Sequence, residues 1–167
     1  MCSGKTTLGK EVARRLGVDF FDLDELIERR SAKSVSRFFA DHGEAAFRRM
    51  EQQVLDELLS YLDGKGGVVA LGGGTPCAEG VMQKLNECGT TVYLSTPVSR
   101  IVERILLEPD NRPLVKGKTP TELSRYVALK LDERHPFYSA ARLIIDSSRL
   151  ETVDEVRRTA ENLLQML

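Results

Sequence analysis

Short apolar runs alternate with helical stretches along the whole chain, and this alternation constrains the fold more than any other feature. The runs cover about residues 18–21, 68–71, 91–94 and 143–145. Between them, apolar residues recur every three or four positions, as they do on one face of a helix. Strands joined by helices pair in parallel, and helices then cover both faces of the sheet. The sequence therefore predicts an α/β fold built around a parallel sheet.

The segments between these runs predict a series of helices and one loop. Helices are expected at about 8–16, 24–30, 34–41, 43–62, 78–88, from Pro97 onward, at 119–133 and at 153–167. Residues 109–118 are polar and have no periodic pattern, which is typical of a mobile loop. The sequence contains no internal repeat, low-complexity tract or linker. We therefore expect a single domain over residues 1–167 with a mobile loop at 109–118.

Composition argues against several classes of protein. With 167 residues, of which 41% are apolar and 29% charged, the chain matches one soluble globular domain. The net charge of -1 argues against a nucleic-acid-binding protein, because such proteins carry a basic surplus. No apolar run approaches the ~18 residues of a membrane span. The three cysteines lie outside any C-x-x-C pair and fit reduced thiols, so we expect a cytoplasmic protein that does not bind membranes.

The segment Ser3-Gly4-Lys5-Thr6-Thr7 matches the second half of the phosphate-binding loop G-x-x-x-x-G-K-[ST] and directly precedes an amphipathic helix. In such a loop, backbone N–H groups hold phosphate oxygens, the Lys reaches the terminal phosphates and the Thr hydroxyl binds Mg²⁺. The opening Gly of the motif would fall before Met1. A capped helix start with an exposed Lys5 is the structural alternative.

Two aspartates, Asp22 and Asp24, follow the expected strand at 18–21. Carboxylates two residues apart at the end of a strand point to the same side. One of them can hold Mg²⁺ while the other orients or deprotonates an acceptor hydroxyl. A helix N-cap is the alternative, since Asp is favoured at that position.

The expected helix at 43–62 has a carboxylate in the middle of its apolar face. At 100° per residue that face centres near Phe47 and Glu51, whereas Arg49 points nearly opposite. A buried carboxylate needs a partner, and Arg48 lies three residues from Glu51 on the same side. The pair is either a structural salt bridge or a device that holds Arg48 rigid, so that its guanidinium can bind a substrate carboxylate.

Three further features are candidates for a site. Gly72-Gly73-Gly74 follows a strand, where glycines either let the backbone approach a ligand or form a flexible loop. Arg134 stands near a helix end and either brings a second cation to the same anion or is solvated. Arg112, in the polar loop, either closes over a transferring phosphate or is solvated. His42 and His135 lack partners at ligand spacing, so neither is assigned to a metal or to acid–base chemistry.

Taken together, these segments resemble the shikimate kinase family. In family order, the matching segments are Ser3-Gly4-Lys5-Thr6-Thr7-Leu8-Gly9, Phe21-Asp22-Leu23-Asp24 with Ile27-Glu28, Gly43-Glu44 with Phe47-Arg48-Arg49-x-Glu51, Leu71-Gly72-Gly73-Gly74, Asn111-Arg112-Pro113-Leu114 and Arg134-x-Pro136-x-Tyr138. They span nearly the whole chain. The resemblance implies a nucleoside-monophosphate-kinase-like fold, in which helices enclose a five-stranded parallel sheet and a mobile lid covers the site. It also implies transfer of the ATP γ-phosphate to the 3-hydroxyl of shikimate, on the route to chorismate and the aromatic amino acids, by a protein expected to be a monomer.

The resemblance implies a role for each matched residue. The ATP phosphates are expected to be bound by Cys2, Ser3, Gly4, Lys5, Thr6 and Thr7, with Arg112 contacting ATP from the lid. Mg²⁺ is expected on Thr6, supported by Asp22. Asp24 is the expected base, with Lys5 and Arg112 as the other catalytic residues. Shikimate is expected to contact Asp24, Arg48, Gly72, Gly73, Gly74 and Arg134, with the two arginines on its carboxylate.

Two rival functions share part of this pattern: another small-molecule kinase of the same fold, acting on an acid such as gluconate or on a nucleotide, and a nucleotide-binding module without catalysis. The chain also departs from the family in two places. Cys2 replaces a frequent Gly, and the first central strand and the opening Gly are missing. We therefore expect that the chain starts at an internal Met, most simply through a mis-assigned translation start, and that the full protein carries about ten more residues.

Overall fold

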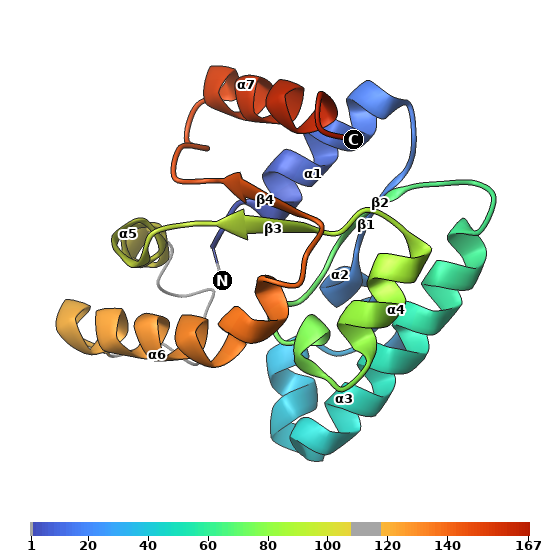
Figure 1. Ribbon diagram of the computed structural model, residues 1–167. Helices are drawn as coiled ribbons and strands as arrows, with labels where there is room; N and C mark the ends of the chain where they lie inside the picture. Colours follow the sequence, from blue (N-terminus) through green and yellow to red (C-terminus); the bar gives the residue numbers. More distant parts are fainter. Residues whose placement is uncertain (1, 108–117) are drawn as a thin grey trace. The chain divides into compact units, whose positions relative to one another are not determined.

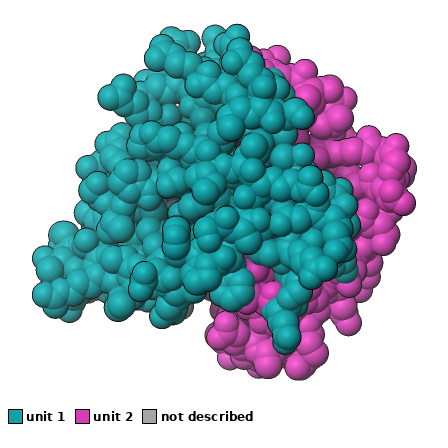
Figure 2. Space-filling view, viewed as in Figure 1, with its two compact units in different colours: residues 1–4, 79–167 teal, residues 5–78 magenta. Residues whose placement is uncertain are grey.

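A computed structural model of the chain describes residues 2–107 and 118–167. It divides into two compact units, which Figure 2 shows in different colours. Residues 5–78 form one, here called the amino-terminal unit, and residues 1–4 and 79–167 form the other, the carboxy-terminal unit. The expectation of one domain over residues 1–167 stays a prediction. The expected mobile loop at 109–118 lies outside the described residues except for its last position.

The amino-terminal unit is built around two parallel strands (Figure 1). Its elements are α1 (Lys5–Leu16), β1 (Phe20–Asp22), α2 (Leu23–Ser31), α3 (Val35–Leu62), β2 (Val68–Ala70) and the short 3₁₀ helix η1 (Thr75–Cys77). β1 pairs with β2, placing Phe20 opposite Val68 and Asp22 opposite Ala70. Helix α1 packs against both strands. The helix comes close to β1 at Gly9, where an added Cβ would lie 2.6 Å from the Phe20 ring.

The helices of this unit bury apolar faces whose spacing matches the sequence pattern. Their buried residues include Leu8, Val12, Leu23, Ile27, Phe47, Val54, Leu55 and Leu58. Ser34 caps α3, because its side chain accepts a hydrogen bond from the N–H of Arg37. Within α3, Gly43 has a φ of 75°, a left-handed conformation that glycine adopts without strain. The two helices expected at 34–41 and 43–62 are therefore joined into one helix that is interrupted at Gly43.

The carboxy-terminal unit also contains a pair of parallel strands. Its elements are α4 (Val81–Cys88), β3 (Val92–Ser95), α5 (Val98–Leu107), α6 (Pro120–Tyr138), β4 (Leu143–Asp146) and α7 (Val153–Leu164). β3 pairs with β4 from Val92–Leu143 to Ser95–Asp146. Helices α5 and α6 pack against each other through the buried side chains of Ile101, Ile105, Leu123 and Val127. The four expected strands are thus all present, in two separate pairs within the described residues.

Helix α6 extends beyond its expected end at residue 133 and reaches Tyr138. It starts with a capping box, in which Thr119 and Glu122 satisfy each other's backbone N–H groups. Pro136 lies in its last turn, where the pattern rules had predicted a stop. Arg134 is therefore a helical residue one turn before the end of α6. Among the described residues, no helix is both long and apolar enough to cross a membrane.

Candidate active site

The phosphate-loop motif continues into the first turn of a helix, as its sequence predicts. Helix α1 begins at Lys5, so Lys5, Thr6 and Thr7 form its first turn. The preceding residues belong to the carboxy-terminal unit, where Cys2 and Gly4 have left-handed φ angles of 43° and 84°. In that unit an added Cβ on Gly4 would clash with Cδ1 of Leu150. The loop backbone at Gly4 is therefore tightly packed.

Arg104 on α5 holds the start of this loop, although it belongs to none of the sequence motifs described above. Its guanidinium donates to the carbonyl oxygen of Cys2 at 3.0 Å and to that of Ser147 at 2.9 Å. It also pairs with the carboxylate of Glu151 at 2.9 Å. These contacts could not be predicted from the sequence, because the partners of Arg104 are far from it along the chain. A single Arg on an amphipathic helix also forms no recognisable motif.

Asp22 joins the phosphate-loop helix to the end of β1. The Thr6 hydroxyl donates to Oδ2 of Asp22 at 2.9 Å. Oδ1 of the same carboxylate accepts from the backbone N–H of Asp24 at 3.1 Å, which makes Asp22 the N-cap of α2. The capping and the metal-site interpretations of Asp22 are therefore compatible, since one carboxylate oxygen serves the helix and the other faces Thr6.

The surroundings of Asp24 raise the pKa of its carboxylate. Burial by the surrounding protein is the largest cause and raises its pKa above 3.8, and the negative charge of Asp22 raises it further. The Lys5 ammonium acts in the opposite direction, while Glu51 and Glu28 add to the rise. The residue as a whole is nevertheless exposed to solvent. A carboxylate with a raised pKa and an accessible tip can accept a proton from a substrate.

Arg48 and Glu51 form the pair that the sequence predicts. Nη1 of Arg48 donates to Oε2 of Glu51 at 2.6 Å. The Glu51 side chain is 1% exposed, whereas that of Arg48 is 31% exposed. Arg49 is exposed on the other side of the helix. The guanidinium is therefore anchored by a buried carboxylate while part of it faces solvent and is available to a ligand.

A third member of this group, Thr75, gave no signal in the sequence. Its hydroxyl donates to Oε1 of Glu51 at 2.7 Å, and the residue is fully buried at the start of η1. Both oxygens of Glu51 thus have a donor. A buried carboxylate with one known partner predicts a second donor, but the pattern does not say which residue supplies it.

The glycine run at 72–74 brings backbone against these side chains. A Cβ added to Gly72 would lie 3.0 Å from Oγ1 of Thr75, 3.1 Å from Oδ1 of Asp24 and 3.3 Å from Oε1 of Glu51. A Cβ added to Gly74 would lie 2.9 Å from Cζ of Arg48. Gly74 has a φ of -95°, so its lack of a side chain serves close approach and not an unusual backbone angle.

The amino-terminal unit therefore brings Asp24, Arg48 and the glycine run together, along with Lys5, Thr6 and Asp22 at the same ends of the strands. Arg134 lies in the carboxy-terminal unit on α6, so its expected place beside Arg48 stays a prediction. The same holds for the expected phosphate contacts of Cys2, Ser3 and Gly4. Arg112 lies outside the described residues.

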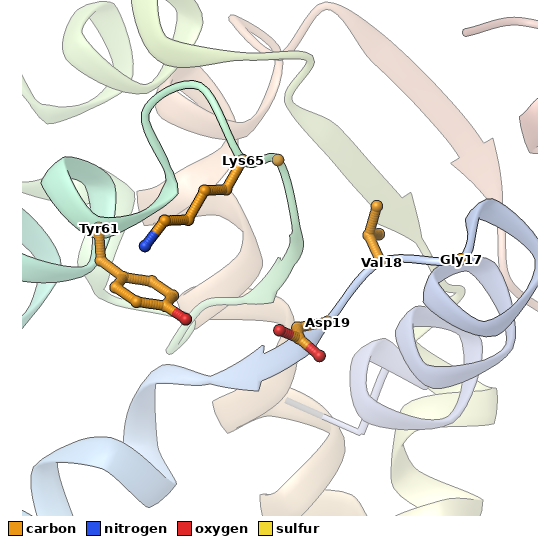
Figure 3. A pocket seen from close by; sticks show the side chains of 6 residues that line it. Gly17, Val18, Asp19, Tyr61 and Lys65 are labelled. Atoms are coloured by element: carbon orange, nitrogen blue, oxygen red, sulfur yellow. The ribbon is translucent and has the colours of Figure 1, made fainter.

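A small open pocket of about 180 Å³ lies elsewhere in the amino-terminal unit. It is lined by Gly17, Val18, Asp19, Tyr61, Lys65 and Gly66 (Figure 3). The Lys65 ammonium already lies 3.9 Å over the Tyr61 ring. These residues precede β1 and β2, whereas Asp22, Asp24 and Gly72 follow or end those strands. Since ligands of parallel α/β sheets bind at the carboxyl ends of the strands, this pocket is separate from the candidate active site.

Comparisons with known proteins agree with this geometry. The family model for shikimate kinase matches residues 1–167. A shikimate kinase from Parabacteroides distasonis is 39% identical over 167 residues, which covers 100% of this chain and 95% of the relative. A shikimate kinase from Phocaeicola vulgatus is 37% identical over 167 residues, which covers 100% of this chain and 94% of the relative.

Solved structures give the same result for the fold. The crystal structure of shikimate kinase from Bacteroides thetaiotaomicron has a TM-score of 0.91 at 35% identity, covering 99% of this chain and 93% of that one. Shikimate kinase from Acinetobacter baumannii, solved in complex with shikimate, has a TM-score of 0.83 at 32% identity, covering 98% and 86%. A gluconokinase from Sinorhizobium meliloti 1021, at 18% identity and a TM-score of 0.60, shares the fold alone.

The expected α/β P-loop kinase fold is thereby confirmed, and so is the resemblance on which the functional expectations rest. The match extends over the whole chain and includes the segments that carry Lys5, Asp24, Arg48 and Gly72–Gly74. The chain belongs to the shikimate kinase family.

Proposed function

We propose that this chain transfers the γ-phosphoryl group of ATP to the 3-hydroxyl of shikimate, giving shikimate 3-phosphate and ADP on the route to chorismate and the aromatic amino acids. The observation that carries the proposal is the convergence of Asp24, the Arg48–Glu51 pair and the glycine run at one end of the parallel strands. A base, an oriented cation and a partly exposed glycine backbone suit the binding and phosphorylation of a small hydroxy acid. The full-length family match supports the same substrate.

The carboxylate of shikimate would bind the guanidinium of Arg48. Because Glu51 holds one edge of the guanidinium at 2.6 Å, the remaining N–H groups are pre-oriented and lose little entropy when the substrate binds. Arg134 is proposed as the second cation on the same carboxylate. The backbone at Gly72–Gly74 would line the ring face of the substrate, since a side chain at Gly74 would displace the guanidinium.

The reaction needs one proton transfer and one phosphoryl transfer. Asp24 would accept the proton of the 3-hydroxyl as its oxygen bonds to the γ-phosphorus, and the bond from that phosphorus to the bridging oxygen breaks to release ADP. Lys5 and the N–H groups around it would hold the phosphate oxygens, with Arg112 closing over them from the lid. Lys5 also lowers the pKa of Asp24, so it acts on the base as well as on the phosphates.

The donor atoms at Thr6 and Asp22 fit Mg²⁺, which prefers hard oxygen ligands. Thr6 offers a hydroxyl and Asp22 a carboxylate, 2.9 Å apart beside the phosphate-loop helix. Among residues 2–107 and 118–167 no three His, Cys, Asp or Glu side chains form a metal-binding group. That agrees with the usual Mg²⁺ site of kinases, which uses few protein ligands together with water and substrate phosphates. When bound, Mg²⁺ would neutralise charge on the phosphates of ATP.

Replacing Thr6 tests this assignment. We expect Thr6→Val to raise the Mg²⁺ concentration needed for half-maximal turnover by about tenfold or more, because the variant keeps the shape of Thr but loses the oxygen ligand. Thr6→Ser keeps the hydroxyl and should stay close to the parent chain. A titration of initial rate against free Mg²⁺ at saturating ATP measures both. Identical titrations for the Val and Ser variants would exclude Thr6 as a ligand.

The proposed activity itself is tested by coupling ADP release to a spectrophotometric assay. We expect ADP release to depend on added shikimate and to be negligible with gluconate or a nucleoside monophosphate in its place. Substrate-independent ATP binding without turnover would instead support a nucleotide-binding module. A monomer in the cytoplasm is part of the same proposal, and light scattering of the purified chain measures its oligomeric state.

A further inference from the structure

We infer that Thr75 is a positioning residue for the acid substrate: it orients the Glu51 carboxylate, which in turn fixes the guanidinium of Arg48. The inference rests on the proposed function, in which Arg48 binds the shikimate carboxylate. The inference adds Thr75 to the residues that the proposed function uses. Thr75 would not contact the substrate itself and would act on Arg48 through two hydrogen bonds.

The contacts form one chain of donors and acceptors. The Thr75 hydroxyl donates to Oε1 of Glu51 at 2.7 Å, and Nη1 of Arg48 donates to Oε2 at 2.6 Å. A carboxylate is planar, so a donor fixed on one oxygen also determines where the other oxygen points. Thr75 cannot move away to solvent, because it is fully buried at the first residue of η1 and its N–H donates to the carbonyl oxygen of Gly72 at 3.1 Å.

Without the Thr75 hydroxyl, Oε1 of Glu51 would lose the donor that the described residues give it, on a side chain that is 1% exposed. Rotation of the carboxylate toward another donor would remove it from Arg48. The guanidinium has no other buried carboxylate to hold it among the described residues, since its second acidic partner, Glu44, is 72% exposed and lies at 3.5 Å. Surface pairs of that kind contribute little to orientation.

The glycine run adds the geometric constraint. Atoms of Thr75, Asp24 and Glu51 all lie within 3.3 Å of a Cβ placed on Gly72. The same short segment, from Gly72 to Thr75, therefore carries the substrate-facing backbone and the hydroxyl that fixes Glu51. A shift of η1 would move both together, which couples the position of Arg48 to the backbone expected to line the substrate.

Thr75→Val tests the inference, because Val fills the same volume without a hydroxyl. We expect the KM for shikimate to rise about tenfold or more, while the KM for ATP changes less than about twofold. Thr75→Ser should restore most of the shikimate affinity. Thr96→Val is the matched control: Thr96 is also buried and shares a 2.6 Å hydrogen bond with the Ser147 hydroxyl, so it reports the cost of losing a buried hydroxyl elsewhere.

A double substitution separates positioning from a general loss of stability. In an Arg48→Lys background the guanidinium that Glu51 orients is already absent, so adding Thr75→Val should raise the KM for shikimate by less than about twofold. Full additivity of the two changes, equal effects on both substrates, or a Ser variant as weak as the Val variant would overturn the inference. If Thr75→Val does not fold, Thr75→Ser is compared with Thr75→Cys, which has a poor donor in the same place. The ratio of the KM for shikimate to the KM for ATP then tests the inference.

These outcomes are distinct from failure of the proposed function. A parent chain that releases no ADP with shikimate rejects the function, whatever Thr75 does. An active parent chain with an unaffected Thr75→Val variant rejects the inference and leaves the function intact.

Discussion

Asp24→Asn is expected to lower kcat by about 10²–10⁴-fold, since that is the usual contribution of a general base. The amide has the same shape as the carboxylate but accepts no proton at neutral pH, so ATP affinity should change little. Single-turnover rates with the purified variant, alongside equilibrium binding of ATP, measure the two effects separately. Glu28→Gln is a matched control, because Glu28 is also an acidic neighbour of Asp24 but its carboxylate accepts from the N–H of Val35 at 2.8 Å. Near-normal turnover in Asp24→Asn would exclude it as the base.

The pH dependence of the parent chain follows from the same residue. Burial raises the pKa of Asp24 above 3.8, and the active form of a base is the ionised one. As pH falls, kcat/KM, which reports the ionisation of the free enzyme, should therefore decline at a higher pH than an ordinary aspartate would give. Above its raised pKa, the ionised Asp24 costs folding stability, and that cost disappears as pH falls toward 3.8. Asp24→Asn should accordingly unfold at a higher temperature than the parent at neutral pH, with a gain that shrinks in acid.

Arg48→Ala is expected to weaken shikimate binding by about 30-fold or more, corresponding to roughly 2–5 kcal/mol for a charge-assisted contact whose partner is left unpaired. The KM for ATP should change little. The variant should also unfold more easily, by about 1–3 kcal/mol, because the buried Glu51 would keep only its bond from Thr75. Calorimetric titration with shikimate and chemical denaturation provide the two measurements.

Arg49→Ala provides the control for this prediction, since it removes the same side chain from the adjacent position of α3. Arg49 is exposed and Arg48 is hydrogen-bonded to Glu51. We expect the Arg49 variant to bind shikimate and to unfold like the parent chain. Equal losses in both variants would show that overall positive charge, and not the orientation of one guanidinium, attracts the substrate.

Much of this fold follows from the period of the apolar residues. The strands lie within two residues of their expected ends, because short buried runs between helical stripes leave few alternatives. The end of α6 lies five residues beyond its expected position, because the helix accommodates the exposed Pro136 in its last turn, where the local rules predict a stop. The pairing of β1 with β2, and of β3 with β4, depends on contacts between distant segments and cannot be read from local patterns.

Parts of the candidate site could be predicted from motifs, as at Lys5 and Thr6, and one part from a residue that breaks a pattern. Glu51 stands in an apolar face, and this position, together with its three-residue spacing from Arg48, predicted the contact that the 2.6 Å hydrogen bond confirms. Neither Thr75 nor Arg104 departs from the sequence pattern around it. One is a small residue after glycines, and the other a cation on a helix whose partners lie 43 and 102 residues away in the sequence. Their importance comes from the folded backbone around them.

The glycine at position 74 leaves the space that the Arg48 guanidinium occupies. Gly74 has backbone angles open to any residue, so only the missing methyl group matters there. Cβ at that position would occupy the space of the Arg48 guanidinium. The volume of a single carbon atom thus decides whether the arginine can keep its position. One glycine-to-alanine change at this position would therefore have to displace the guanidinium, and the proposed carboxylate site would be altered without any change to Arg48 itself.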